Sequence, residues 1–268
     1  MTATVRGTRG APLAAATAAE TYKLWTLRAH RAAVLAAPAV SAAVAVLLCA
    51  TVGATTGSSM AEHSAFDMVA TSLLGVDAAS VVLLTVGAAT VGVEYSTGMV
   101  RTTLTALPAR GRFLAARTAA VGSAALGAGL LSAAAGFAAG QLVLAAAGLP
   151  TVSPLEPQVL RALGGTALTA PFLALAAVFL AVVLRSTTGG VVGALVLLAL
   201  PAPVRWGPES WQGVVLGVLP TEALHSLAGL TAQDAPFHLP AAAAAAVLLG
   251  WLVPLYGAAR AALSRRDA

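Results

Sequence analysis

The chain is organised around residues 94–117, EYSTGMVRTTLTALPARGRFLAAR, a polar and basic run between two apolar blocks. On a helix, four residues of its first half fall on one face because they recur every three or four positions: Glu94, Gly98, Arg101 and Thr105. Pro108 cannot continue a helix, so the run breaks there before the next apolar block. Such a segment can lie at a membrane surface and present its polar face to a partner. The alternative is a solvated loop that carries only topogenic charge.

The composition excludes a soluble fold. Of the 268 residues, 59% are hydrophobic and 9% are charged, whereas soluble domains carry about 25% charged residues. The net charge of +5 does not indicate a nucleic-acid partner, because the basic residues lie between apolar blocks and form no patch. Cys49 is the only cysteine and has no partner for an intrachain disulfide. The chain is therefore expected to reside in a lipid bilayer.

Six apolar segments are predicted to be membrane-spanning helices, for which about 20 residues are needed. They are 32–52, a second segment that ends at residue 93, 118–147, 163–184, 189–204 and 240–256. The predicted fold is all-α: a polytopic membrane protein with six transmembrane helices. It forms a single domain over residues 20–268, after a poorly ordered tail over residues 1–19.

Prolines, glycines and short loops predict further details of these spans. Pro171 is expected to kink the fourth span, and the short loop at Arg185 forces the fourth and fifth spans into an antiparallel pair. Before the last span, residues 211–219 and 221–230 are predicted as two short helices separated by Pro220. The third span contains a GxxxG pair that permits close approach of another helix: Gly136 and Gly140.

The start of the second span decides the role of Asp77. If the span begins near Val69, Asp77 lies inside the membrane, where an ionisable residue is a functional candidate. If residues 66–75 form a separate short helix, Asp77 caps the N-terminus of a span over residues 78–93. We favour the cap, since the apolar segments offer Asp77 no buried basic partner.

The distribution of positive charge predicts the topology. Of the 15 Lys and Arg residues, 13 lie in the N-terminal segment, in residues 94–117, in the Arg185 loop and in the C-terminal tail. Only Arg161 and Arg205 fall on the opposite side. Because basic residues are retained on the cytoplasmic side, both termini are expected to be cytoplasmic.

Residues 20–31, ETYKLWTLRAHR, precede the first span and are predicted to form an interfacial helix. Tyr22 and Trp25 share one helical face and are expected at the level of the lipid headgroups.

Signatures of catalysis are missing from the sequence. Lys23 is the only lysine and lies in no phosphate-binding loop, and there is no HExxH, GxSxG or CxxC motif. Glu222 and His225 have a spacing that suits a metal, but further ligands are not evident. The chain is therefore expected to be neither an enzyme nor a cofactor-binding protein.

Residues 94–117 resemble the cytoplasmic connection after the second span of ABC-2-type transporter permeases. Glu94, Gly98, Pro108 and Arg110 match its pattern of a Glu, a following Gly and Pro-x-Arg, while Met99 and Arg117 stand where Thr and Lys are common. Residues 20–28 resemble the elbow helix of that family, and residues 218–224 resemble its outer segment before the last span. The chain is similar to the single-domain permeases of actinobacterial exporters.

The resemblance implies a permease subunit in the bacterial plasma membrane. It would pair with a second permease copy and two copies of a separate ABC ATPase subunit. The coupling surface would comprise Glu94, Gly98, Arg101, Pro108 and Arg110, flanked by an elbow helix with Glu20, Lys23, Trp25 and Arg28. Glu94 is expected to orient this surface by bonding to nearby backbone or by pairing with Arg101 or Arg110, and Gly98 to permit a bend or a close approach.

The rival interpretation is a stand-alone carrier, channel or scaffold without an ATPase partner. The sequence does not identify a substrate, because the apolar spans contain no set of hydrogen-bonding side chains that would select one ligand.

Overall fold

The computed structural model describes residues 12–98 and 110–265, and within these ranges the chain is helical without any strand. The elements in chain order are α1 (Leu13–Thr26), α2 (Arg28–Ala50), α3 (Val52–Thr56), η1 (Met60–Glu62), α4 (Ala65–Leu73), α5 (Gly75–Ser96), α7 (Arg110–Ala146), α8 (Pro157–Ala167), α9 (Thr169–Leu184), α10 (Thr187–Ala199), α11 (Pro201–Val204), α12 (Glu209–Gly217), α13 (Pro220–Ala228) and α14 (Ala241–Arg265).

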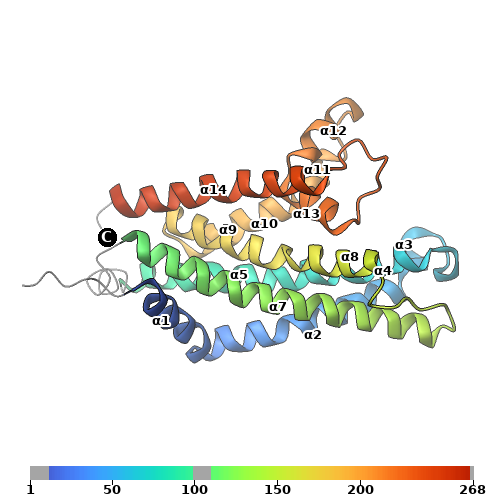
Figure 1. Ribbon diagram of the computed structural model, residues 1–268, viewed down its shortest axis with the longest axis horizontal. Helices are drawn as coiled ribbons and strands as arrows, with labels where there is room; N and C mark the ends of the chain where they lie inside the picture. The colour runs from blue at the N-terminus through green and yellow to red at the C-terminus, as the bar shows by residue number, and fades with distance from the viewer. Residues whose placement is uncertain (1–11, 99–109, 266–268) are drawn as a thin grey trace, which may run out of the picture.

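Six helical segments of the described chain are long and apolar enough to cross a membrane, so the six predicted spans are confirmed as apolar helices. They are Arg28–Ala50, Ala65–Tyr95, Arg110–Ala146, Pro157–Leu184, Thr187–Val204 and Ala241–Arg265. Figure 1 shows them running side by side as an elongated bundle. The second, fourth and fifth spans each consist of two helices joined at one residue, which is Leu74, Leu168 and Leu200 respectively.

The predicted Pro171 kink is found as the break between α8 and α9. Proline has no N–H to donate to the carbonyl four residues earlier, which here belongs to Ala167, the last residue of α8. The predicted antiparallel pair is also present, since α9 ends at Leu184 and α10 begins at Thr187. Two short helices also precede the last span, as expected, but Pro220 is the first residue of α13 and α12 ends at Gly217.

The predicted cap at Asp77 is wrong. A separate helix, α4, does precede the break, but α5 begins at Gly75 with Leu74 as its N-cap, so that Asp77 lies inside the first turn. The apolar span runs from Ala65 to Tyr95 and contains Asp77. His225 of α13 lies within electrostatic reach of its carboxyl group, a partner that the sequence did not reveal.

Close packing through small residues builds the centre of the bundle. α5 packs along α9, and α2 packs along α7. A Cβ atom on Gly140 would lie 2.5 Å from Cβ of Ser72, and one on Gly136 would lie 2.8 Å from Oγ of Ser41. The GxxxG pair therefore does face neighbouring helices, α4 and α2, as its spacing predicts.

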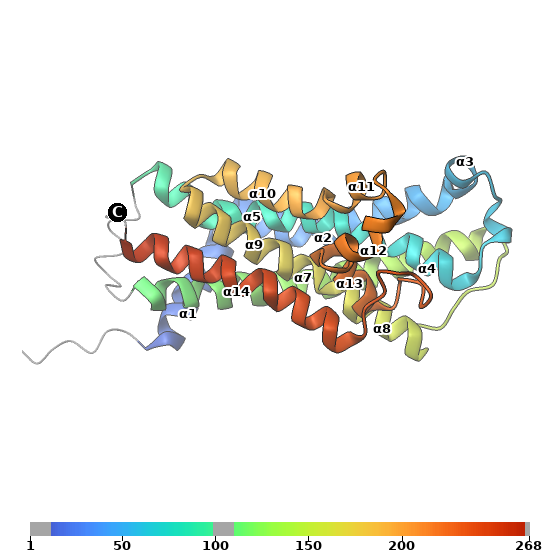
Figure 2. The ribbon, with the colours of Figure 1, turned by 90° about the horizontal axis from the view of Figure 1, so that it is seen from above.

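The two ends of the bundle differ in charge. Figures 1 and 2 show α1, the start of α7, the α9–α10 turn and the end of α14 at one end, and α3, α8 and α11–α13 at the other. Among the Lys and Arg residues that the structure describes, Arg161 of α8 and Arg205 after α11 alone belong to the second end. The elements thus segregate positive charge as the sequence predicts.

The N-terminal helix differs from its prediction in both of its bounds. It begins at Leu13, within the range that was expected to be a poorly ordered tail, and it ends at Thr26. Leu27 has an extended conformation, and Arg28 is the first residue of α2 and not part of the preceding helix. α1 therefore runs across the predicted boundary between residues 19 and 20.

Candidate functional site

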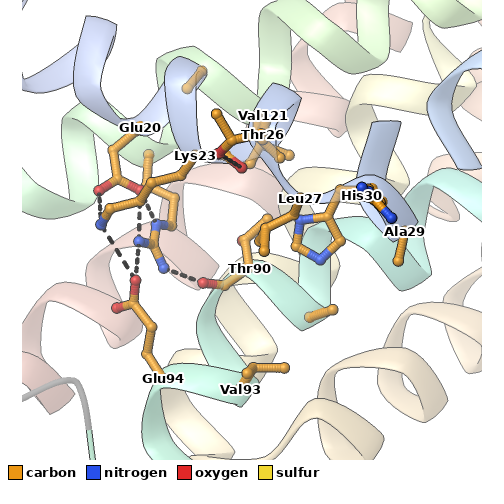
Figure 3. Close-up of a pocket in the computed structure, with 15 residues that line it drawn as sticks. Glu20, Lys23, Thr26, Leu27, Ala29, His30, Thr90, Val93, Glu94 and Val121 are labelled. Carbon is orange, nitrogen blue, oxygen red and sulfur yellow. Dashed lines mark hydrogen bonds and ion pairs between the residues drawn. The ribbon is translucent and has the colours of Figure 1, made fainter. Parts of the chain in front are cut away.

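A buried ion network lies where α1 crosses α5 and α7, at the basic end of the bundle. It consists of Glu20 and Lys23 from α1, Glu94 from the last turn of α5 and Arg117 from the second turn of α7. Figure 3 shows Glu20 and Lys23 of α1 and Glu94 of α5 pointing toward one another. We call these four residues the ion network.

Arg117 is the centre of the ion network. Only 1% of its side chain is exposed. Its Nε donates to Oε2 of Glu20 at 2.8 Å, and its Nη2 donates to Oε1 of Glu94 at 2.7 Å. Its Nη1 donates to the carbonyl oxygen of Thr90, and its guanidinium carbon lies 4.6 Å from the centre of the Phe113 ring. Every nitrogen of the guanidinium group therefore has an acceptor, which is how a buried arginine is stabilised.

Lys23 completes the charge balance. Its Nζ lies 2.7 Å from Oε1 of Glu20 and 3.4 Å from Oε1 of Glu94. Two carboxylates thus face one guanidinium and one ammonium group, so the ion network is neutral when all four groups are ionised. Side-chain exposure is 6% for Glu20 and 12% for Glu94, but 44% for Lys23. The acids are thus enclosed, whereas the lysine reaches solvent.

Helical periodicity explains why these residues meet. The buried residues of α1 are Ala16, Glu20 and Leu24, which recur every four positions and form its inward face. That face packs on α7, where Phe113 and Arg117 are also four residues apart and buried. The hydrogen bond from Arg117 to Glu20 joins residues that are 97 positions apart in the chain.

Of the predicted coupling residues, Glu94 belongs to the ion network, and among the described residues it does not pair with Arg110. It pairs with Arg117 and Lys23. Arg110 begins α7 and donates instead to the carbonyl oxygens of Leu263 and Ser264 at the end of α14. Arg101 and Pro108 lie outside the described residues.

Gly98 ends α5 and does not continue it. Its φ of +71° lies in the left-handed region, and a Cβ atom there would have no neighbour within 4 Å among the residues that the structure describes. Of the two expected roles, the left-handed φ supports the bend, and the close approach stays a prediction. The predicted single helical face through Glu94 and Gly98 is wrong, because the helix stops at Ser96.

The residues predicted for the N-terminal helix divide into two groups. Glu20 and Lys23 point inward and join the ion network. Trp25 is exposed on the outer surface, and Arg28 is exposed at the start of α2. Glu222, considered above for a metal, instead pairs with Arg205 at 2.6 Å.

No known family model matches this chain. A search of curated proteins likewise finds no match. The family resemblance accordingly rests on the residues quoted above.

Arg117 is the residue that sequence reasoning missed. It was counted as topogenic charge, yet it is more deeply buried than the other members of the ion network. The available signal was its position at the start of the third apolar segment, with apolar residues on both sides, since a charge at such a site needs a partner. The sequence does not identify that partner, because Glu20 and Glu94 are both compatible with the position of Arg117.

Proposed function

We propose that this chain is the membrane-spanning permease subunit of an ATP-driven exporter of the ABC-2 type. It works with a second permease copy and two copies of a separate ABC ATPase subunit in the bacterial plasma membrane. Both termini are cytoplasmic, which places the ion network and the connection after α5 on the side of the ATPase. Segregation of positive charge to this end of the bundle supports that orientation.

The ion network is the observation that carries the proposal. Glu94 precedes the connection over residues 99–109 and Arg117 follows it, and the two side chains are joined to each other and to α1. A force applied to the connection therefore cannot move α5, α7 or α1 alone without separating buried charges. Because separating them is costly, the three helices respond as one unit. A transporter driven from the cytoplasm requires such mechanical linkage.

A motor outside the chain is required by this function. The chain carries no phosphate-binding loop of its own, so its energy source is a partner that binds ATP. The ATPase docks on the connection whose direction Gly98 sets, with Arg110 anchoring the far end of the connection to α14. The substrate crosses between the two permease copies.

The test is whether an ABC ATPase from the same organism co-purifies with this chain and is coupled to it. With the wild-type chain we expect a stable complex whose ATP hydrolysis is stimulated by the permease. In Gly98→Val the stimulation is expected to fall by roughly tenfold, because a side chain in the left-handed region costs about 1–2 kcal/mol and redirects the connection. The measurement is ATP hydrolysis by the complex reconstituted in lipid discs.

Gly57 provides a matched control. Its φ is +75°, a Cβ atom there also has no neighbour within 4 Å, and it lies after α3 at the opposite end of the bundle. Gly57→Val is expected to leave stimulation unchanged. Equal stimulation by both variants and the wild type would show that the connection is only a topogenic loop. Failure of the ATPase to bind the wild-type chain would favour a stand-alone carrier, channel or scaffold.

A further inference from the structure

We propose that the pocket beside the ion network is a binding site for an anionic phospholipid. Lys23 and Arg28 hold the phosphate group, and one acyl chain enters the apolar part of the pocket. This role is independent of the transport function proposed above, since it concerns the chain by itself.

The pocket lies between the α1–α2 corner, α5 and α7 (Figure 3). Its volume is about 470 Å³, which falls within the range of small-ligand sites in proteins. Glu20 and Glu94 line it together with His30 and Thr90. The ion network therefore forms one wall of the pocket.

The remaining wall is mainly apolar. It is formed by Leu24 and Leu27 at the corner, Ala89 and Val93 on α5, and Ala120 and Val121 on α7. Leu27 and Val93 are half-exposed on the outside of the bundle, so the pocket meets the surface among apolar side chains. Such a surface faces hydrocarbon in a membrane, which suits entry of an acyl chain.

The accessible charge of the pocket is positive. Both of its carboxylates are nearly enclosed and are paired with Arg117 and Lys23. Lys23 keeps 44% of its side chain exposed, and Arg28 is exposed with no side-chain partner among the residues that the structure describes. A ligand therefore meets cations first, and a guanidinium group binds phosphate through two parallel hydrogen bonds.

The depth of the cations in the membrane matches that of a phosphate group. Arg28 is the first residue of the first apolar span. On α1, Tyr22 and Trp25 are exposed, as is typical of aromatic residues at the headgroup level. The pocket thus begins among the headgroups and its apolar part extends toward the hydrocarbon, which is the polarity of a phospholipid.

The test compares dioleoylphosphatidylglycerol with dioleoylphosphatidylcholine, bound to the purified full chain in detergent without any ATPase. Native mass spectrometry measures the lipid retained. We expect the wild type to retain the anionic lipid preferentially. Arg28→Gln is expected to weaken retention of that lipid about fivefold, the contribution of one cationic side chain near an anionic headgroup. Retention of phosphatidylcholine should fall less, because its choline group offsets the charge of its phosphate.

Two further variants separate a built site from general attraction. Arg31 is exposed one turn later on α2 but does not line the pocket, so Arg31→Gln should retain lipid like the wild type. Ala89→Phe fills the apolar part and should lower retention of both lipids.

Equal losses in Arg28→Gln and Arg31→Gln, or equal retention of the two lipids by the wild type, would overturn the proposal. Displacement of the lipid by free glycerol 3-phosphate would reduce the site to an anion site. None of these outcomes bears on ATPase coupling.

Discussion

Arg117→Met is expected to destabilise the protein by about 3–5 kcal/mol, the cost of removing one partner from a buried ion pair. The loss leaves the carboxylates of Glu20 and Glu94 facing each other, with Lys23 as their remaining partner. Methionine fills a similar volume, so the effect reports on charge more than on a cavity. The measurement is the temperature at which half of the detergent-purified protein loses its monodisperse peak in size-exclusion chromatography. Arg31→Met, at an exposed arginine of α2, serves as the control and should unfold like the wild type.

A triple variant separates stability from function. Replacing the whole buried part of the ion network by apolar residues of similar size is often neutral for stability. We therefore expect Glu20→Leu, Glu94→Leu and Arg117→Met together to recover most of the stability lost by the single variant. Lys23 tolerates this change because its exposed ammonium group can extend into water. If coupling to an ATPase stays low while stability recovers, the charges serve transmission. A triple variant as unstable as Arg117→Met would contradict the charge argument.

Gly129→Ala is expected to destabilise the bundle by about 1–3 kcal/mol through overpacking. The added Cβ atom would lie 2.4 Å from the carbonyl oxygen of Ala167 and 3.0 Å from Cβ of Ala170. Ala167 is the residue whose carbonyl loses its helical donor at Pro171, and α7 passes close to it there. A backbone atom cannot rotate away as a flexible side chain can, so α7 must separate from the end of α8 and the start of α9. Unfolding temperature again provides the measurement.

Gly127, two residues earlier in α7, is the matched control with the opposite expected sign. A Cβ atom there meets nothing within 4 Å. Gly127→Ala should therefore stabilise the helix by up to about 1 kcal/mol, because alanine loses less backbone entropy than glycine. If both variants shifted the unfolding temperature in the same direction, the close contact between α7 and the α8–α9 break would be refuted.

Several features of this protein were determined by its sequence alone. Apolar segments near the length of a bilayer predicted the six spans, since in lipid a chain must satisfy its backbone hydrogen bonds within helices. Pro171 and Pro220 predicted interruptions between helices, because proline lacks the N–H group that a helix interior requires. The clustering of basic residues between spans predicted which elements share an end of the bundle. All of these signals are local, and they depend on residue type and spacing within one segment.

The ion network and the pocket were decided only by the tertiary structure. Glu20, Glu94 and Arg117 come from three distant segments, and their meeting depends on how α1, α5 and α7 are rotated about their axes. Sequence periodicity reveals that rotation in a soluble protein, where only the inward face of a helix is apolar. In a membrane both faces of a span are apolar, so α7 carries Gly127 and Gly129 with nothing in the sequence to tell the open position from the packed one. Helix rotation, and with it the partner of Arg117, is set by packing between helices and not by exclusion from water.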